Sequence, residues 1–224
     1  MRHWVIVLIV LSPCAVAEPR GFRGGISLTH DYHFQGIDQN RDRMELSGEI
    51  GWRANNNVSA GAWFGEFRLP FYDESTAEID YFVRYDKQLA FGHHIDTSLW
   101  QYTYLDADYH RYNWTQWLTN YHLDERFIFT LGLSRNLFFS DEITTFAEVT
   151  AHHNFGPITA GLSMAANDLP GSPLASFQYI QLKAVYAAGR WQFFGDYTAT
   201  LGVTDPTTRR LAHEGLSVGL SRNF

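Results

Sequence analysis

The sequence predicts an all-β fold, a single transmembrane antiparallel up-and-down β-barrel of about twelve strands. Three observations predict this fold. Apolar and polar residues alternate along almost the whole chain, which is typical of strands with one apolar and one polar face. Short and long connections alternate between these strands. The sequence also opens with an export signal and closes on an aromatic residue, Phe224.

Residues 1–17 have the three-part composition of a secretory signal peptide. A short basic start precedes an apolar run from Trp4 to Leu11, and Ala15-Val16-Ala17 form a small-residue cleavage site. The apolar run is too short to cross a bilayer as a helix. We therefore expect an exported protein in which residues 18–224 form the barrel.

Composition narrows the classes of function. Cys14 is the only cysteine, so cleavage after Ala17 would leave a mature chain without disulfides or cysteine-bound metal. A lipoprotein that retains Cys14 is the alternative, although Pro13 fits that motif poorly. The formal net charge is −7 and basic residues gather only at Arg209-Arg210, which indicates no nucleic-acid binding. No apolar run is long enough for a membrane-spanning helix.

The alternation defines the strands in order. In the first segment one face holds Ile26, Leu28, His30, Tyr32 and Phe34. The opposite face holds Ser27, Thr29, Asp31, His33 and Gln35. About twelve such segments, each close to the 9–11 residues of a tilted membrane strand, begin near Gly25, Arg43, Val58, Ala77, Ile95, Tyr112, Arg126, Ile143, Ile158, Phe177, Arg190 and His213.

The connections between these segments fall into two sets. Short ones are expected at 54–57, 123–125, 154–157 and 188–189, and longer polar ones at 37–42, 69–76, 106–111, 167–176 and 204–212. Short turns at one rim and long loops at the other are the layout of an outer-membrane barrel. The connection 87–94 is an exception, since it is too long for a tight turn. Every proline after the signal lies outside the predicted strands, as its missing N–H requires.

Two all-β classes fit this alternation. A soluble barrel or sandwich turns its apolar face inward, whereas a membrane barrel turns it toward lipid. The apolar faces are rich in Tyr, Phe and Trp near strand ends, which suits the two membrane interfaces. The export signal and the final strand that ends in Phe224 point the same way, because a terminal aromatic is a signal for assembly into outer membranes. We therefore predict a barrel in the outer membrane of a Gram-negative bacterium, with the lipid bilayer and, through Phe224, the barrel assembly machinery as partners.

The stretch from Ser27 to Gln39, SLTHDYHFQGIDQ, resembles the opening of the TorF family putative porins. The signal peptide, the chain length and the terminal aromatic match the layout of that family as well. The resemblance implies an outer-membrane barrel that acts as a passive channel for small solutes, in a family otherwise of unknown function. Members tend to carry arginine where this chain has His33 and Gln35, so a positive ring expected there is weakened.

Several residues resemble the parts of a catalytic or metal site. On a continuous strand Asp31 and His33 would share a face but lie about 6.6–6.8 Å apart, too far for a direct hydrogen bond, so we interpret them as part of the barrel wall. The pairs His93-His94 and His152-His153 lie near predicted turns, and no metal-ligand spacing is evident.

A barrel hydrolase remains an alternative, because strand pairing could assemble Ser98, His122 and Asp31, but no Gly-x-Ser-x-Gly motif is present. We predict no catalytic residues, no metal and no cofactor.

The polar faces carry the functional prediction. The residues expected to line the lumen are Asp31, His33, Glu45, Glu49, Arg53, Glu78, Asp80, Arg84, Asp86, Glu148, Lys183 and Asp196, with Asp96 on the same face. These include nine acids and three bases, and about twelve strands predict a bore between the filled eight-strand barrel and the open porin. The sequence thus predicts a narrow acidic channel for small cationic or zwitterionic solutes, in which inward-facing Trp63, Phe67 or Phe82 could stack on an alkylammonium group. A non-conducting structural or adhesive barrel is the alternative.

Overall fold

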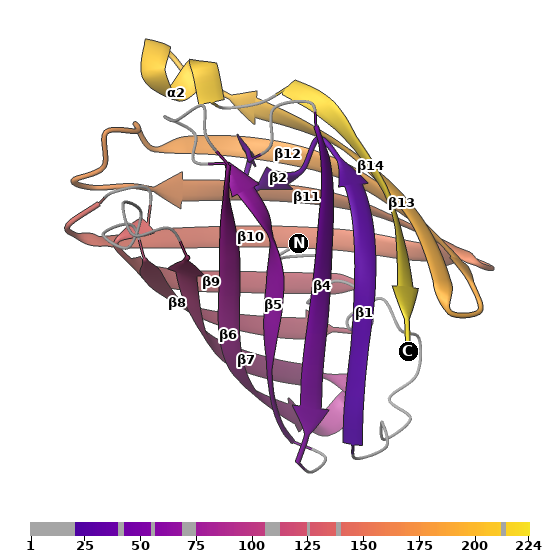
Figure 1. Cartoon of the computed structure of the whole chain (residues 1–224). Coiled ribbons are helices and arrows are strands. Elements are labelled where there is room, and N and C mark those ends of the chain that lie inside the picture. The colour runs from indigo at the N-terminus through magenta and orange to yellow at the C-terminus, as the bar shows by residue number, and fades with distance from the viewer. Residues whose placement is uncertain are drawn as a thin grey trace.

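The computed structural model describes residues 21–39, 43–54, 57–68, 75–105, 113–124, 126–137, 140–211 and 214–224. In this part of the chain twelve long antiparallel strands close into one barrel (Figure 1). The strands are β1 (Gly21–His30), β4 (Met44–Arg53), β5 (Val58–Arg68), β6 (Ser75–Gln88), β7 (His94–Tyr104), β8 (Trp114–Leu123), β9 (Phe127–Arg135), β10 (Ile143–Phe155), β11 (Ile158–Asp168), β12 (Phe177–Ala188), β13 (Trp191–Leu201) and β14 (Glu214–Asn223). The remaining elements are β2 (His33–Phe34), β3 (Ile37–Asp38), the 3₁₀ turn η1 (Ala90–Gly92) and the short helix α2 (Pro206–Leu211).

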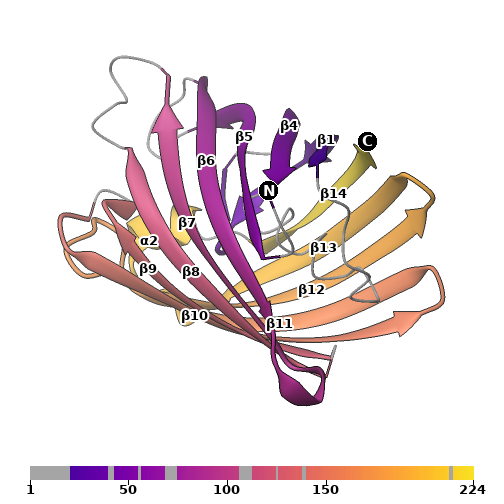
Figure 2. The ribbon, with the colours of Figure 1, turned by 90° about the horizontal axis from the view of Figure 1, so that it is seen from below.

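Each barrel strand pairs with its neighbours in sequence, and β1 pairs with β14 to close the ring (Figure 2). This seam is extended by two hydrogen bonds, from the Gly24 N–H to the Phe224 carbonyl at 3.2 Å and from the Phe224 N–H to the Gly24 carbonyl at 3.0 Å. A Cβ atom on Gly24 would lie 2.8 Å from the Phe224 ring and 2.7 Å from the Glu49 carbonyl. Gly24 therefore lets the final aromatic ring lie directly over the first strand.

The outer surface of the barrel is apolar and its inward faces are polar. Large apolar side chains are exposed on every long strand, with Leu46 at 67% and Leu131 at 66%. Along β6, exposed Tyr81, Val83 and Tyr85 alternate with buried side chains that include the charged Arg84. A water-soluble barrel would have the opposite arrangement, because an apolar surface of this extent is not stable in water. The orientation is that of a membrane barrel.

The two ends of the barrel differ. At the end where β1 begins and β14 ends, here called the terminal end, neighbouring strands are joined by short turns. At the opposite end, here called the loop end, the connections are longer, and α2 lies there (Figure 1). Among the described residues no helix has the length and apolar character needed to cross a membrane.

The predicted all-β barrel of twelve strands is confirmed, and most predicted starts lie within two residues of the observed ones. Two details differ. β1 begins at Gly21, four residues before the predicted start, so Arg23 also belongs to the wall. The predicted long connection 87–94 is a short turn, because β6 continues to Gln88 and η1 turns the chain back into β7. The predicted signal peptide, residues 1–17, lies outside the described residues.

Candidate functional site in the barrel interior

Eleven of the residues predicted on the lumen face lie on strand faces that point into the barrel. Eight are buried: Glu45, Arg53, Glu78, Asp80, Arg84, Asp86, Asp96 and Asp196. Glu49, Glu148 and Lys183 are half-buried on the same inward faces. Trp63 and Phe82 are buried there too, while the side chain of Phe67 lies outside the described part. Arg23, which the predicted strand start had excluded, adds a fourth base to this interior, next to Glu49.

The prediction for Asp31 and His33 is wrong in one respect, because the wall ends at His30. Asp31 has a φ of 56°, in the left-handed region, and redirects the chain. β2 and β3 then pair as a hairpin with Phe34 opposite Ile37. We call residues Asp31–Gln39 the inner hairpin. Tyr32 and Phe34, expected to face lipid, are instead 2% and 1% exposed.

The turn of the inner hairpin explains its sharp reversal. The two residues between Phe34 and Ile37 are Gln35 and Gly36, with φ values of 49° and 81°. A two-residue loop with both φ values positive is the type I′ turn, whose twist matches that of the flanking strands. A Cβ atom on Gly36 would lie 2.8 Å from the Tyr179 ring. Glycine is therefore required both for the backbone conformation and for the close approach to β12.

The inner hairpin reaches opposite walls of the barrel. On one side the His33 ring nitrogen lies 3.9 Å from Asp196 on β13, and the Asn167 side chain on β11 donates to the Gln35 carbonyl at 3.1 Å. On the other side Phe34 packs against rings on β7 and β8. β13 and β7 are six positions apart in the ring of twelve strands. The hairpin thus crosses the interior in its loop-end half.

This turn also changes the relation between Asp31 and His33. Their side chains form an ion pair at 3.3 Å, whereas a straight strand would hold them too far apart. The expected separation was wrong because it assumed a continuous strand. The two residues belong to a structure inside the barrel and not to its wall.

An aromatic cluster, defined as Phe34, Trp100, Tyr102 and Trp114, fills the side of the interior where the hairpin meets β7 and β8. The Tyr102 and Trp114 rings are stacked with centroids 3.6 Å apart, and Phe34 lies 5.6 Å from Trp114. The Tyr102 hydroxyl donates to the Gln116 side chain at 3.2 Å. These contacts make the loop-end half of the interior largely aromatic. The sequence alone does not show whether these Trp and Tyr side chains point into the barrel or outward, because aromatic residues occur on both faces of β7 and β8.

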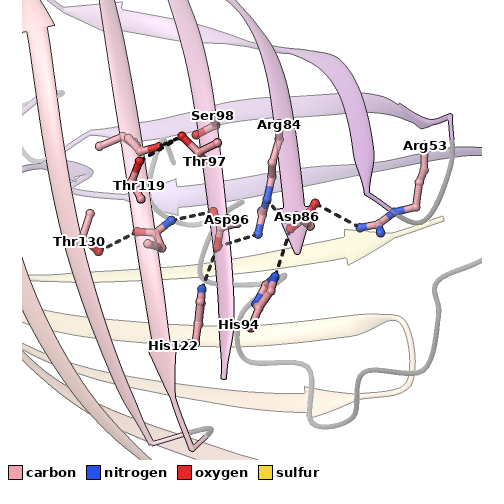
Figure 3. Close-up of polar contacts among 12 residues, drawn as sticks. Arg53, Arg84, Asp86, His94, Asp96, Thr97, Ser98, Thr119, His122 and Thr130 are labelled. Atoms are coloured by element: carbon pink, nitrogen blue, oxygen red, sulfur yellow. Dashed lines mark hydrogen bonds and ion pairs between the residues drawn. The ribbon is translucent and has the colours of Figure 1, made fainter. Parts of the chain in front are cut away.

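A second group of side chains lies near the terminal end. We call Arg53, Arg84, Asp86, His94, Asp96 and His122 the charge cluster, and Figure 3 shows these side chains converging from neighbouring strands. Arg84 on β6 contacts Asp86 at 2.9 Å and Asp96 on β7 at 3.2 Å. His122 on β8 lies 2.7 Å from Asp96, while His94 and Arg53 approach Asp86 at 3.6 and 3.9 Å.

Sequence reasoning assigned the two arginines and both aspartates of the charge cluster to polar strand faces, and it interpreted His94 as a residue of a rim or turn. His94 is the first residue of β7 and points inward, two residues before Asp96. The period-two pattern of Asp96, Ser98 and Trp100 extends back to it. His122 becomes part of the charge cluster through the pairing of β7 with β8, because it lies directly opposite His94 in the register. That pairing could not be read without knowing the strand alignment.

The residues considered for a hydrolase are not brought together as that alternative requires. Asp31 follows the loop end of β1 and pairs with His33. His122 lies at the terminal end and pairs with Asp96. The Ser98 hydroxyl accepts a hydrogen bond from the Trp100 indole at 3.0 Å. His122 and Asp31, which that alternative requires to meet, therefore each pair with a different residue.

Residues 14–124 match the model of a family described as a bacterial protein of unknown function (Gcw_chp). The chain also resembles solved membrane-protein structures. A chain from a study of the in-meso crystallization of membrane proteins aligns with a TM-score of 0.53 at 9% identity, over 91% of this chain and 83% of that one. The Acinetobacter baumannii outer membrane protein Omp33 aligns with a TM-score of 0.47 at 8% identity, over 92% and 97%. OccAB1 of the same species aligns at 0.43 and 10% identity, over 92% and 65%.

At these identities the likeness extends to the fold alone. No curated protein sequence matches the chain. The matched family model states no activity, so the resemblance to the TorF family putative porins stays an expectation.

Proposed function

We propose that this protein is a porin-like channel of the bacterial outer membrane, through which small cationic or zwitterionic solutes diffuse along a narrow acidic lumen. The observation that carries the proposal is the inversion of the barrel, with an apolar outer surface and charged inward faces. Placing Arg or Lys on the lipid face at the bilayer midplane costs about 2–4 kcal/mol each, whereas lumen positions set selectivity.

The sign of the charge supports a preference for cations. The inward faces and the inner hairpin carry ten acids, including Asp31, Asp38 and Asp96, against the four bases Arg23, Arg53, Arg84 and Lys183. An excess of carboxylates along a pore attracts cations and repels anions. This excess of acids supports the proposed preference for cations.

Polar atoms in the interior support a wet lumen. The hydroxyls of Ser59, Ser217 and Ser221 and the side-chain amide of Gln35 are buried without a hydrogen-bond partner among the described residues. Leaving such groups unsatisfied costs about 1–3 kcal/mol each. Ordered water satisfies buried polar groups of this kind. Water along these inward faces is what a path for small polar solutes requires.

The inner hairpin supports a narrow bore. It crosses the loop-end half, so any solute path must pass beside it. The same feature favours the second candidate function, a non-conducting structural barrel in which the hairpin and the aromatic cluster close the interior. Conductance separates the two functions. Ser98, His122 and Asp31 do not meet, so the proposal includes no hydrolase.

Assembly into the outer membrane is part of the proposal. Phe224 lies at the seam over Gly24 and is 65% exposed on the apolar surface. A terminal aromatic in that position is accessible to a barrel assembly machinery that recognises the last strand. The bilayer would then contact the apolar surface of all twelve strands.

The test is single-channel recording of the purified barrel in planar bilayers under a salt gradient. Lys183 and Asp196 offer a matched pair, because they lie opposite one another on β12 and β13. Asp196→Asn should shift the reversal potential toward lower cation preference, and Lys183→Gln should shift it the other way. A clear preference of the unmodified protein for anions would refute the sign, and the absence of conductance would favour the structural barrel.

A further inference from the structure

The charge cluster contains three side chains that are arranged as metal ligands. His94 and Asp96 are two residues apart on β7, so both point into the barrel. His122 on β8 is the direct cross-strand partner of His94. One ligand atom from each residue lies within 4.8 Å of the other two. The two imidazole rings are stacked with centroids 4.7 Å apart, so both present their edges to the same region.

We propose that His94, Asp96 and His122 bind a divalent transition-metal ion of the Zn²⁺ class at the terminal end of the lumen. Two imidazoles and one carboxylate suit Zn²⁺, Co²⁺, Ni²⁺ or Cu²⁺, whereas Mg²⁺ and Ca²⁺ favour sets composed only of oxygen. Metal–ligand distances of about 2.0–2.2 Å place the ligand atoms of a tetrahedral site about 3.3–3.6 Å apart. The separation between His122 and Asp96 is shorter than this and the three ligand atoms lie within 4.8 Å of one another, so binding requires side-chain movements but no change in the strands.

Neighbouring residues hold the carboxylate in the orientation that the site needs. The Asn120 side chain donates to Asp96 Oδ1 at 2.9 Å, and the Thr130 hydroxyl donates to Asn120 at 2.7 Å. The other carboxylate oxygen, Oδ2, then faces His122. Hydrogen bonds to metal ligands of this kind fix ligand geometry, and their loss costs about 10–100-fold in metal affinity.

The site is open on one side. The side chain of His94 is 28% exposed, while those of Asp96 and His122 are 1% and 11% exposed. An ion entering from the terminal end therefore meets His94 first and the fixed Asp96–His122 pair behind it. Three protein ligands leave the fourth position to water or to a solute in the lumen.

Arg84 limits the affinity of the site. Its guanidinium lies 3.2 Å from Asp96 and competes with the metal for that carboxylate. Asp86 offsets this effect, because it holds Arg84 at 2.9 Å and lies 3.6 Å from His94. The balance of charges favours a reversible site that samples the surrounding fluid over one that retains its ion permanently.

The test is calorimetric titration of ZnCl₂ into the full-length barrel in detergent micelles, with folding checked by circular dichroism. The unmodified protein should bind one ion at this site. Single substitutions His94→Gln and His122→Gln should each raise the Kd at least about tenfold. His153→Gln is the matched control, because His153 is an exposed histidine near the same end whose ring contacts Phe155, and it should leave the Kd unchanged.

An unchanged Kd in both His94→Gln and His122→Gln, or an equal loss in His153→Gln, would overturn the proposal. A second measurement separates a ligand from a residue that only supports the fold. Asn120→Ala keeps all three ligands and should weaken Zn²⁺ about tenfold while the circular dichroism spectrum stays the same. The titration needs no conductance, so a barrel that does not conduct can still bind zinc, and a conducting barrel can fail to bind it.

Discussion

The two halves of the barrel interior are filled by different chemistry. The loop-end half holds the inner hairpin and the aromatic cluster, in which ring contacts surround Phe34 and the Asp31–His33 ion pair lies nearby. The terminal-end half holds the charge cluster, whose contacts are ion pairs and hydrogen bonds. The side chains of Asp31 and His33 are 3% and 1% exposed, whereas that of His94 in the charge cluster is 28% exposed. In the proposed channel, one half would therefore restrict the path by volume and the other by electrostatics.

The largest expected effect comes from removing the volume restriction. Replacing residues 32–38 by a short Gly-Ser linker should raise the single-channel conductance several-fold, because the inner hairpin crosses the interior. The control is the same linker in place of α2, which lies at the same end but is not part of the inner hairpin (Figure 1). If the conductance of the hairpin variant is unchanged, the loop-end half does not limit the path.

The second prediction concerns the contribution of the charge cluster in the terminal-end half to the free energy of unfolding. Asp96→Ala leaves Arg84, His122 and Asn120 without their shared acceptor. Breaking a buried charge pair from one side costs about 3–5 kcal/mol in the free energy of unfolding. Urea unfolding in lipid vesicles measures the loss. Glu66→Ala is the control, because Glu66 is an exposed acid and a surface substitution changes stability by about 0.5 kcal/mol or less.

The third prediction concerns the packing of the inner hairpin in the loop-end half, which Phe34→Ala tests. Removing the ring from its contacts with Tyr102 and Trp114 should cost about 3 kcal/mol, at the low end of the range for buried Phe, because water can enter the space. Phe129→Ala on the outer face is the matched control and creates no internal cavity. Equal losses for the two variants in urea unfolding would contradict a packed role for the hairpin.

The smallest expected effect concerns α2 at the loop end. The Thr208 N–H donates to the Asp205 carboxylate at 2.6 Å, and this backbone hydrogen bond holds the Asp205 pKa below its ordinary value. A depressed carboxyl pKa stabilises the helix above the ordinary pKa, and the stabilisation is lost as the pH falls through the lowered value. Hydrogen exchange at the Thr208 amide should therefore accelerate in acid.

Asp205→Ala should remove this pH dependence, because the alanine side chain cannot accept the hydrogen bond. Conductance should not change, since the substitution leaves the inner hairpin and the charge cluster intact. A pH profile that persists in the variant would mean that another group controls the helix.

Most of the barrel could be predicted from the sequence because the alternation of apolar and polar residues determines its strands. Alternation such as Tyr81, Val83 and Tyr85 against Arg84 and Asp86 fixes both the strand and its orientation once lipid is outside. Pairing between neighbours in sequence then fixes the ring.

The interior could be predicted only in part, because the same alternation concealed the inner hairpin. Tyr32 and Phe34 continue the apolar pattern of β1, and only Gln35-Gly36 between apolar residues marked the turn. Packing against Tyr179 on β12, more than 140 positions later, decides where that turn goes. The charge cluster likewise depends on which residue of β7 faces His122, a relation that strand alignment determines.

The inner hairpin also affects the mechanics of the barrel. A cylinder of twelve strands with an empty centre flattens easily under the lateral pressure of a bilayer. Here a covalent continuation of β1 ties the wall at Asn167 and Asp196 to the wall at Tyr102 and Trp114. We therefore expect this internal brace to resist flattening of the barrel.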